Sequence, residues 1–280
     1  MLSGLGGASE ATKRRIEAAV KALGYQRNRM ASGLRSARST LVGVVIPDLQ
    51  NPFFTRIVAG IESVLHERGY TLFLANSDSD LERERAELQM LRSERVCGVL
   101  IIPCGIEGAA YQGLLESKLP LVVIDRVPEG LPADSVTVAN EQGAYAAVCK
   151  LLASGARKVG MVNGPASIGV ARERAKGFMR AMEEADVEVC SDWVNTGDFR
   201  SESGYECTLK ALGRKERPEA LFVGNFLMAL GALKAVRELG LRVPEDVALF
   251  VFDDMPWAEA RVGERRILGA YAWQRMRAAG

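Results

Sequence analysis

Short apolar runs that alternate with helical patterns constrain this chain more than any other feature. The run LVGVVIP begins at residue 41, and further apolar runs begin near residues 70, 97 and 121. A helical pattern separates each run from the next. Apolar runs spaced by single helices predict βαβ units, and hence a parallel sheet that is buried on both faces.

The same alternation repeats in the second half of the chain, with apolar runs near residues 157, 193, 219 and 245. The helices predicted between the runs cover residues 53–68, 80–94, 140–153, 173–185, 203–212 and 226–240. The chain of 280 residues is long enough for roughly two domains. We therefore predict an α/β fold with two doubly wound parallel-sheet subdomains, of four to five strands each, over residues 41–139 and 140–254.

The head of the chain, residues 1–40, differs in charge from the remainder. It contains eight Lys or Arg and two Glu, whereas the other 240 residues contain 28 basic and 33 acidic residues. Ser9 as N-cap and Gly24 after the last apolar position predict a helix over residues 10–23. A basic head suggests an arm that meets a polyanion, and a solvated basic helix without a partner is the alternative.

Residues 28–36 form a segment that is too short to be helical alone in water, so it is expected to order only against a partner. Residues 37–40 then form a linker.

Several functional classes are disfavoured by composition. The single histidine, His66, cannot supply a histidine-rich metal site, and neither a GxxxxGK[ST] phosphate loop nor a GxSxG elbow occurs. The five cysteines form no C-x-x-C pair and are expected to be free thiols in a reducing compartment. No membrane span or signal peptide is evident, so a cytoplasmic location is expected, without catalytic residues, metal or cofactor.

Ligands of open parallel sheets bind beyond the carboxyl ends of the strands, where this chain carries many polar side chains. Amides, carboxylates and arginines beside aromatic rings suit a small polyhydroxy ligand, although Asp and Asn at strand ends are also common turn and cap residues. Arg174 is expected to open the helix that follows the Asn163 loop. The strand-end residues are Asp48, Gln50, Asn51, Phe53, Phe54, Asn76, Asp78, Asp125, Arg126, Asn163, Gly164, Gly197, Asp198, Asn225, Asp253 and Asp254.

The segment SEATKRRIEAAVKALGYQRNRMASGLRSARSTLVGVVIPDLQNPFF resembles the LacI/GalR family of bacterial transcriptional repressors. The segments ERGYTLFLANSD, RVCGVLIIP, VVIDR, RERAKGFMRAMEEA and LMALGALKAVRELGLRVPEDVALFVFDD show the same likeness, in the same order. The resemblance covers residues 1–254. It implies a helix-turn-helix head, a hinge helix, and a core like periplasmic sugar-binding proteins that closes over a small effector in a dimer and so changes operator affinity.

The resemblance also implies roles for particular residues. The hinge matches at Asn28, Ala31 and Leu34, and this leucine would be wedged into the minor groove of DNA. Arg27 and Ser32 stand where the family usually has proline and arginine. The DNA-binding residues expected are Asn28, Ala31, Leu34 and Arg35. The effector-binding residues expected are Asn51, Phe53, Phe54, Asp125, Arg126, Arg174, Asn225 and Asp253.

The chain departs from the family pattern at three places. Phe226 stands where the family usually has Asp, a residue that would cap the following helix or touch the ligand, so this wall of the effector site departs from the family pattern. Residues 1–4 align with the end of the recognition helix, so most base-reading residues are absent and weak, salt-dependent DNA binding is expected. Residues 255–280 form an atypical basic tail without a strand, as a frameshift near Trp257 would produce. A late start codon would account for the other departure, a truncated helical DNA-binding head and hinge helix over residues 1–40.

The interpretation favoured by these observations is a repressor of carbohydrate-related genes whose core binds a sugar or sugar derivative and which dimerises through residues 53–68. The alternatives are a stand-alone sugar-binding protein with the same core, or a non-functional remnant unable to read DNA. The retained hinge and the lack of a signal peptide argue against the first alternative. An enzyme is not expected, because no nucleophile–base pair is visible.

Overall fold

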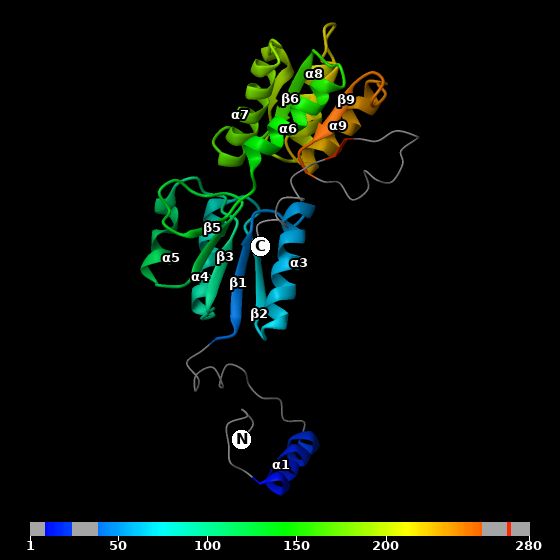
Figure 1. Ribbon diagram of the computed structural model, residues 1–280. Helices are drawn as coiled ribbons and strands as arrows, with labels where there is room; N and C mark the ends of the chain where they lie inside the picture. Colours follow the sequence, from blue (N-terminus) through cyan, green and yellow to red (C-terminus); the bar gives the residue numbers. More distant parts are fainter. Residues whose placement is uncertain (1–8, 24–38, 254–267, 270–280) are drawn as a thin grey trace. The chain divides into compact units, whose positions relative to one another are not determined.

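The computed structural model describes residues 9–23, 39–253 and 268–269. The chain divides into two compact units, Met1–Thr40 and Leu41–Gly280. The predicted DNA-binding residues Asn28, Ala31, Leu34 and Arg35, and nearly all of the tail, lie outside the described residues. Figure 1 shows the described helices and strands.

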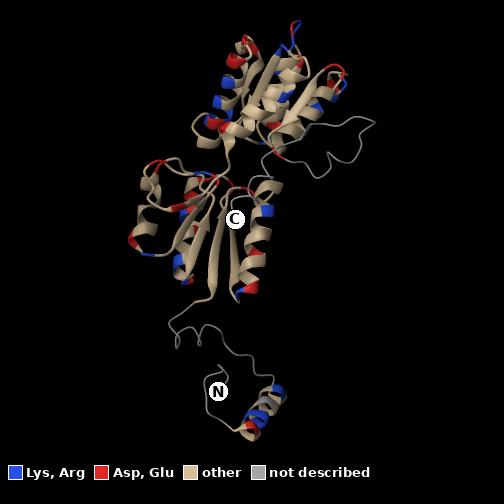
Figure 2. Ribbon diagram, in the orientation of Figure 1, with Lys and Arg blue, Asp and Glu red and all other residues tan. Residues whose placement is uncertain are grey.

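In the first unit the helix α1 covers Glu10–Ala22, as the sequence predicts. The Ser9 side chain caps it by accepting a hydrogen bond from the backbone N–H of Thr12, at 3.4 Å. Glu10 in the first turn and Lys21 in the last turn suit the helix dipole. Figure 2 shows several Lys and Arg positions along α1.

The second unit begins with a five-stranded parallel sheet in the order β2-β1-β3-β4-β5. Val45 of β1 packs with α4 and α5 on one face, whereas Val44 and Ile46 pack with α3 on the other. This alternation explains why β1 is apolar at every position. The elements are β1 (Leu41–Ile46), α3 (Pro52–Glu67), β2 (Thr71–Asn76), α4 (Leu81–Ser93), β3 (Gly98–Ile101), η1 (Gly108–Tyr111), α5 (Gln112–Glu116), β4 (Leu121–Ile124) and β5 (Asp134–Val136).

A second parallel sheet follows, in the order β10-β9-β8-β6-β7. Its elements are α6 (Asn140–Ala153), β6 (Val159–Asn163), α7 (Gly169–Glu184), η2 (Ser191–Trp193), β7 (Val194–Thr196), α8 (Ser201–Leu212), β8 (Ala220–Val223), α9 (Phe226–Glu238), β9 (Ala248–Val251) and β10 (Leu268–Gly269). One face packs against α6 and α7 and the other against α8 and α9. The two doubly wound sheets predicted from the sequence are confirmed.

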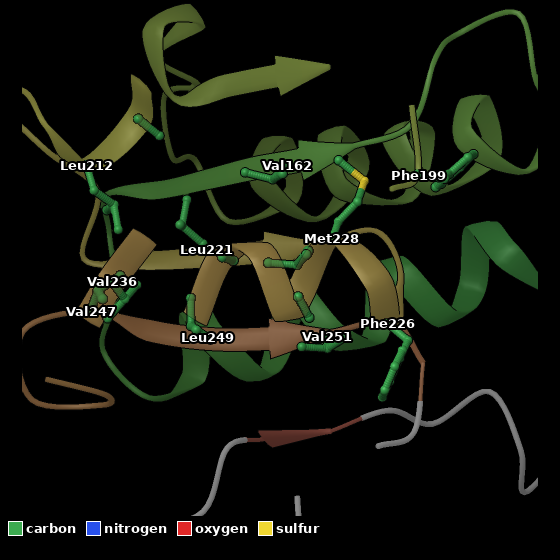
Figure 3. Packing of buried hydrophobic residues seen from close by; sticks show 14 of the residues in the cluster. Val162, Phe199, Leu212, Leu221, Phe226, Met228, Val236, Val247, Leu249 and Val251 are labelled. Carbon is green, nitrogen blue, oxygen red and sulfur yellow. The ribbon is translucent and has the colours of Figure 1, made fainter. Parts of the chain in front are cut away.

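Figure 3 shows how the second sheet packs against α8 and α9. Leu221, Val223 and Leu249 of the sheet meet Met228 and Val236 of α9, and all are almost completely buried. The close approach of helices in this half depends on glycines. A Cβ on Gly231 would lie 1.9 Å from the carbonyl oxygen of Ser201 in α8.

One strand was not predicted, and two expectations about secondary structure are wrong. The three-residue strand β5 is exposed along its whole length, so no apolar run marks it in the sequence. The helix predicted to begin at residue 173 begins at Gly169, because Gly169 and Val170 are weak helix formers that hide its first turn; Arg174 therefore lies inside α7 rather than at its start. The tail does contribute a strand, since β10 pairs in parallel with β9.

Within the described parts of the chain, no helix is long and apolar enough to cross a membrane.

Candidate functional site

A cavity of about 110 Å³ lies where the carboxyl ends of strands from both sheets meet. All eight effector-site residues predicted from the sequence contribute to its wall, although they are spread over 203 positions from Asn51 to Asp253. The cavity is lined by Asp48, Asn51, Phe53, Phe54, Ser79, Cys104, Asp125, Arg126, Ile168, Val170, Arg174, Asp198, Phe199, Arg200, Asn225 and Asp253.

The loop after β1 places two aromatic rings in this wall. Asn51 caps α3, because its side-chain oxygen accepts a hydrogen bond of 3.0 Å from the backbone N–H of Phe53. Pro52 follows as the first helical residue, where its fixed φ suits the helix start. The rings of Phe53 and Phe54 meet edge to face at a centroid distance of 5.3 Å, and Phe54 is buried. Capping thus holds the rings in a defined arrangement.

Asp125 and Arg126 follow β4 and carry polar atoms with unmet hydrogen-bonding capacity. Asp125 Oδ1 and Arg126 Nε are both buried, and neither has a hydrogen-bond partner among the described residues. Asp125 Oδ2 lies 3.9 Å from Arg126 Nε, and the Asp125 side chain is 4% exposed. Burial raises the pKa of Asp125, and the nearby Arg126 and Arg174 oppose this shift.

Asp125 has φ of +65°, a left-handed conformation in which Asp and Asn are better tolerated than most residues. The turn that follows β4 directs the carboxylate into the cavity wall. The guanidinium of Arg126 lies 5.8 Å from the ring centroid of Phe54 and 6.0 Å from that of Phe199. Phe54 lies in α3, which packs on the first sheet, and Phe199 follows β7 of the second sheet, so Arg126 faces both halves of the cavity.

Arg174 is almost completely buried and is held by three partners. Its Nε donates to Asn140 Oδ1 at 2.9 Å, and its Nη1 donates to the carbonyl oxygen of Gly224 at 2.5 Å. The guanidinium stacks on the Phe252 ring at 3.8 Å from its centroid. Burial lowers the pKa of Arg174, while Asp253 and Asp125 act in the opposite direction.

Asn225 and Asp253 form the wall near the start of α9. Asn225 Oδ1 accepts from the N–H of Met228, and Asn225 Nδ2 donates to the carbonyl of Phe199, both at 2.9 Å. Asp253 Oδ2 accepts from the backbone N–H of Phe226 at 2.9 Å. Burial raises the pKa of Asp253, opposed by Arg174. The helix start is therefore capped without an acidic residue at position 226.

The Phe226 side chain itself belongs to the hydrophobic core rather than to the cavity wall. It is 7% exposed and lies at the end of the cluster nearest the start of α9 (Figure 3). This wall is therefore built from Asn225 and Asp253.

Sequence reasoning missed several residues of the wall. Asp198 and Asp48 were recognised as strand-end residues, but the neighbouring Phe199 was not, although it adds a third ring and has φ of +70°. One signal was available for Phe199, since it directly follows a strand-end carboxylate. The other lining residues outside the predicted sets are Ser79, Cys104, Ile168, Val170 and Arg200.

Cys104 contributes a thiol to the wall. Its burial, with the nearby Glu84, raises the pKa of the thiol to about 12. Since the thiolate is the nucleophilic form of cysteine, this thiol is protonated and weakly reactive at neutral pH.

Among the described residues, two ion pairs link the two halves of the core. Arg172 of α7 lies 3.3 Å from Glu129, which follows β4, and Arg200 lies 3.4 Å from Asp78, which follows β2. These side chains are about half exposed or more, so each pair contributes little stability. Among the residues described, no cluster of three His, Cys, Asp or Glu side chains could hold a metal ion.

Two doubly wound sheets with a polar cavity at the meeting point of their strand ends define a class of ligand-binding core. Residues 39–264 match the family model described as periplasmic binding proteins and sugar binding domain of LacI family. The chain belongs to the LacI family of transcriptional regulators.

Similar proteins support this assignment. The chain is 36% identical over 250 residues to the HTH-type transcriptional repressor PurR of Serratia proteamaculans, covering 88% of this chain and 73% of that protein. A putative ribose operon repressor from Burkholderia thailandensis superimposes with a TM-score of 0.74 at 32% identity, covering 80% of this chain and 83% of that one.

The lac repressor dimer bound to operator and the anti-inducer ONPF superimposes with a TM-score of 0.81 at 27% identity. That comparison covers 92% of this chain and 78% of the lac repressor chain. These relatives are transcriptional repressors, not enzymes.

Proposed function

We propose that this chain is a transcriptional repressor whose core binds a small carbohydrate or carbohydrate derivative and thereby changes its affinity for an operator. The observation that supports this most directly is the convergence of all eight predicted effector residues on one cavity. The proposed domain limits are a DNA-binding head over 1–40, core subdomains over 41–139 and 140–254, and a tail over 255–280.

The unpartnered atoms of the cavity support a hydroxyl-bearing ligand. Among the described residues, Asp125 Oδ1 has no hydrogen-bond donor and Arg126 Nε has no hydrogen-bond acceptor. A hydroxyl group both donates and accepts, so neighbouring hydroxyls can serve both atoms. Buried polar atoms without partners are costly, and a ligand that pairs them gains the corresponding free energy.

Charge and shape support the same class of ligand. The buried carboxylates of Asp125 and Asp253 are balanced by Arg174, which is buried, and Arg126, whose side chain is 13% exposed. A neutral ligand leaves this balance undisturbed. The rings of Phe53, Phe54 and Phe199 provide apolar surface for the C–H groups of a sugar ring, which is a common composition for a small-molecule site.

Thermal unfolding of the 280-residue chain with D-ribose, D-glucose, D-gluconate and adenine tests the proposal. A ligand at 100 times its dissociation constant adds about 2.7 kcal/mol of stability. This corresponds to a rise in Tm of about 5–10 °C for a core of this size. A rise with a sugar or sugar acid supports the proposal. A rise with adenine alone contradicts a carbohydrate effector, and a cooperative transition that no compound shifts counts against the whole ligand class.

The role of Arg174 is tested by calorimetry with the compound that gives the largest rise. Arg174→Ala removes the most deeply placed guanidinium of the helix α7 side of the cavity wall, and we expect the affinity to fall about 10- to 100-fold. Arg180→Ala is the matched control, because Arg180 lies on the same helix and pairs with Glu141 outside the cavity. Equal affinities for the wild type and Arg174→Ala would remove Arg174 from the site.

We further propose that the basic head binds DNA through Asn28, Ala31, Leu34 and Arg35 in a homodimer. The repressor relatives and the operator-bound dimer of the lac repressor support this reading. Fluorescence anisotropy with a labelled random-sequence duplex tests it, since contacts to phosphates make log K fall linearly with log salt concentration. Binding that does not weaken with salt, or no binding at low salt, would contradict it.

A further inference from the structure

The only segment through which the described chain passes from the first sheet to the second is Thr137–Ala139, between β5 and α6. Asn140 follows this segment directly as the first residue of α6, and it is 1% exposed. Its backbone N–H donates to the carbonyl oxygen of Val138 at 2.8 Å, and its side-chain Nδ2 donates to the same oxygen at 3.1 Å. Two bonds from one residue therefore hold Val138.

The remaining polar atom of the same amide binds a residue of the cavity wall. Asn140 Oδ1 accepts the hydrogen bond from Arg174 Nε at 2.9 Å. Every hydrogen-bonding atom of this buried side chain thus has a defined partner, one on the connecting segment and one in the cavity wall. An amide is suited to this position because it is both a donor and an acceptor, whereas a carboxylate or an aliphatic side chain lacks one or both functions.

The surrounding contacts also hold α6 and α7 close together, so neither helix can shift easily relative to the other. A Cβ on Gly177 of α7 would lie 2.2 Å from the carbonyl oxygen of Glu141. On the exposed side, Glu141 forms ion pairs with Lys176 at 2.8 Å and with Arg180 at 2.7 Å. The buried bridge through Asn140 and the exposed ion pairs through Glu141 are separate links between the same two helices.

From this arrangement we infer that Asn140 is a positioning residue that orients the Arg174 guanidinium in the cavity and ties it to the segment connecting the two sheets. A displacement of Arg174 is then transmitted to Val138 through the Asn140 side chain. The functional meaning of this link rests on the proposed function of the cavity, because a bound effector would act on Arg174. The link itself exists without any ligand and can be measured without one.

Hydrogen exchange of the backbone amide of residue 140 reports the link, because this amide donates to Val138 and exchanges only when that bond opens. We compare the ligand-free wild-type chain with Arg174→Met and with the matched control Arg180→Met. The control removes a guanidinium from the same helix that also pairs with α6. We expect exchange at least ten times faster in Arg174→Met and unchanged in Arg180→Met.

A second measurement uses the side-chain signal of Arg174 itself. The Nε–H resonance is expected to exchange slowly with water in the wild type and in Asn140→Asp, which retains an oxygen acceptor. It should exchange rapidly in Asn140→Leu, which has none. Because Asn140→Asp loses the donor to Val138, it should keep the Arg174 signal while the residue-140 amide exchanges faster, and this split would not arise from a general loss of packing.

The inference is overturned if Arg174→Met leaves the residue-140 amide as protected as in the wild type, or if Arg180→Met exposes it equally. Where Arg174→Met does not fold, the comparison of Asn140→Asp with Asn140→Leu decides, and equal Arg174 signals in the two variants overturn it. Failure of the carbohydrate proposal leaves these ligand-free results unaffected. Conversely, if a variant loses the link between Arg174 and Val138 but still binds D-ribose, only the positioning role is contradicted.

Discussion

Replacing Asp125 by Asn separates what the cavity requires for binding from what the fold requires for stability. The Asp125 carboxylate is buried and 3.9 Å from Arg126, and its Oδ1 has no partner within the described structure. Asn keeps the shape of the side chain and tolerates the left-handed conformation at φ +65°. The substitution therefore removes the charge with little strain in the backbone.

The expected magnitude follows from two opposing contributions. An unsatisfied buried group costs about 1–3 kcal/mol, and more when it is charged. The attraction between Asp125 and the two arginines offsets part of this cost. We expect a net gain of about 1 kcal/mol in the free energy of unfolding of the ligand-free chain at pH 7, which raises Tm by about 2–4 °C.

The pH dependence of stability gives the sign of the change in unfolding free energy by a separate argument. Burial raises the pKa of Asp125 above its ordinary value of 3.8, so the folded chain binds a proton at pH values where the unfolded chain has already released it. Stability contributed by this group is therefore lost as pH rises from 3.8 through the raised pKa. The advantage of Asp125→Asn should be absent near pH 3.8 and grow as the pH approaches neutrality.

Thermal unfolding from pH 4 to pH 8, with and without the compound that stabilises the wild type most, measures both effects. Asp186→Asn is the matched control, because Asp186 also has positive φ, at +52°, but is exposed. The ligand-induced rise in Tm should shrink in Asp125→Asn and stay unchanged in the control. An Asp125→Asn chain that unfolds at or below the wild-type temperature at pH 7, with an unchanged pH dependence, would refute this reasoning.

Three further predictions concern packing, DNA and assembly. Gly177→Ala should lower the free energy of unfolding by about 1–3 kcal/mol, because the added Cβ would meet the Glu141 carbonyl oxygen. Urea unfolding measures this loss. Gly113→Ala is the control and should show no such loss, because the nearest atom to its Cβ would be 3.9 Å away. Leu34→Ala in a version with a complete head should weaken DNA binding through loss of the minor-groove wedge, and an unchanged gel-shift titration would contradict this. Light scattering should give the mass of two chains if the helix over 53–68 forms a dimer interface, and a one-chain mass would count against it.

Much of the fold follows from local sequence. LVGVVI must be buried on both faces, since a continuous apolar run leaves no polar face for water, and α3 and α4 cover it as the alternating pattern predicts. The cavity residues could also be predicted from the sequence. Parallel strands end at one edge of a sheet, so Asp48 and Asp125 are expected at one edge of the first sheet, and Asn225 and Asp253 at one edge of the second. The family resemblance implies that these two edges close over one effector.

Elements with weak local signals could not be predicted from the sequence. The strand β5 is exposed and three residues long, and β10 consists of two residues whose pairing depends on β9. The ring of Phe199 joins the cavity only because the chain adopts positive φ beyond β7. In each case the conformation is imposed by neighbours that are distant in the sequence.

The sequence by itself determined the order of strands and helices and the family to which the chain belongs, because burial of periodic apolar residues is a local requirement. Only the tertiary structure decided how the polar side chains are partnered. Arg174 and Asn140 lie 34 residues apart, and their hydrogen bond exists because α6 and α7 pack closely. Asp125 Oδ1 and Arg126 Nε have no hydrogen-bond partner among the described residues for the same kind of reason, since the surrounding elements bury these atoms without supplying partners.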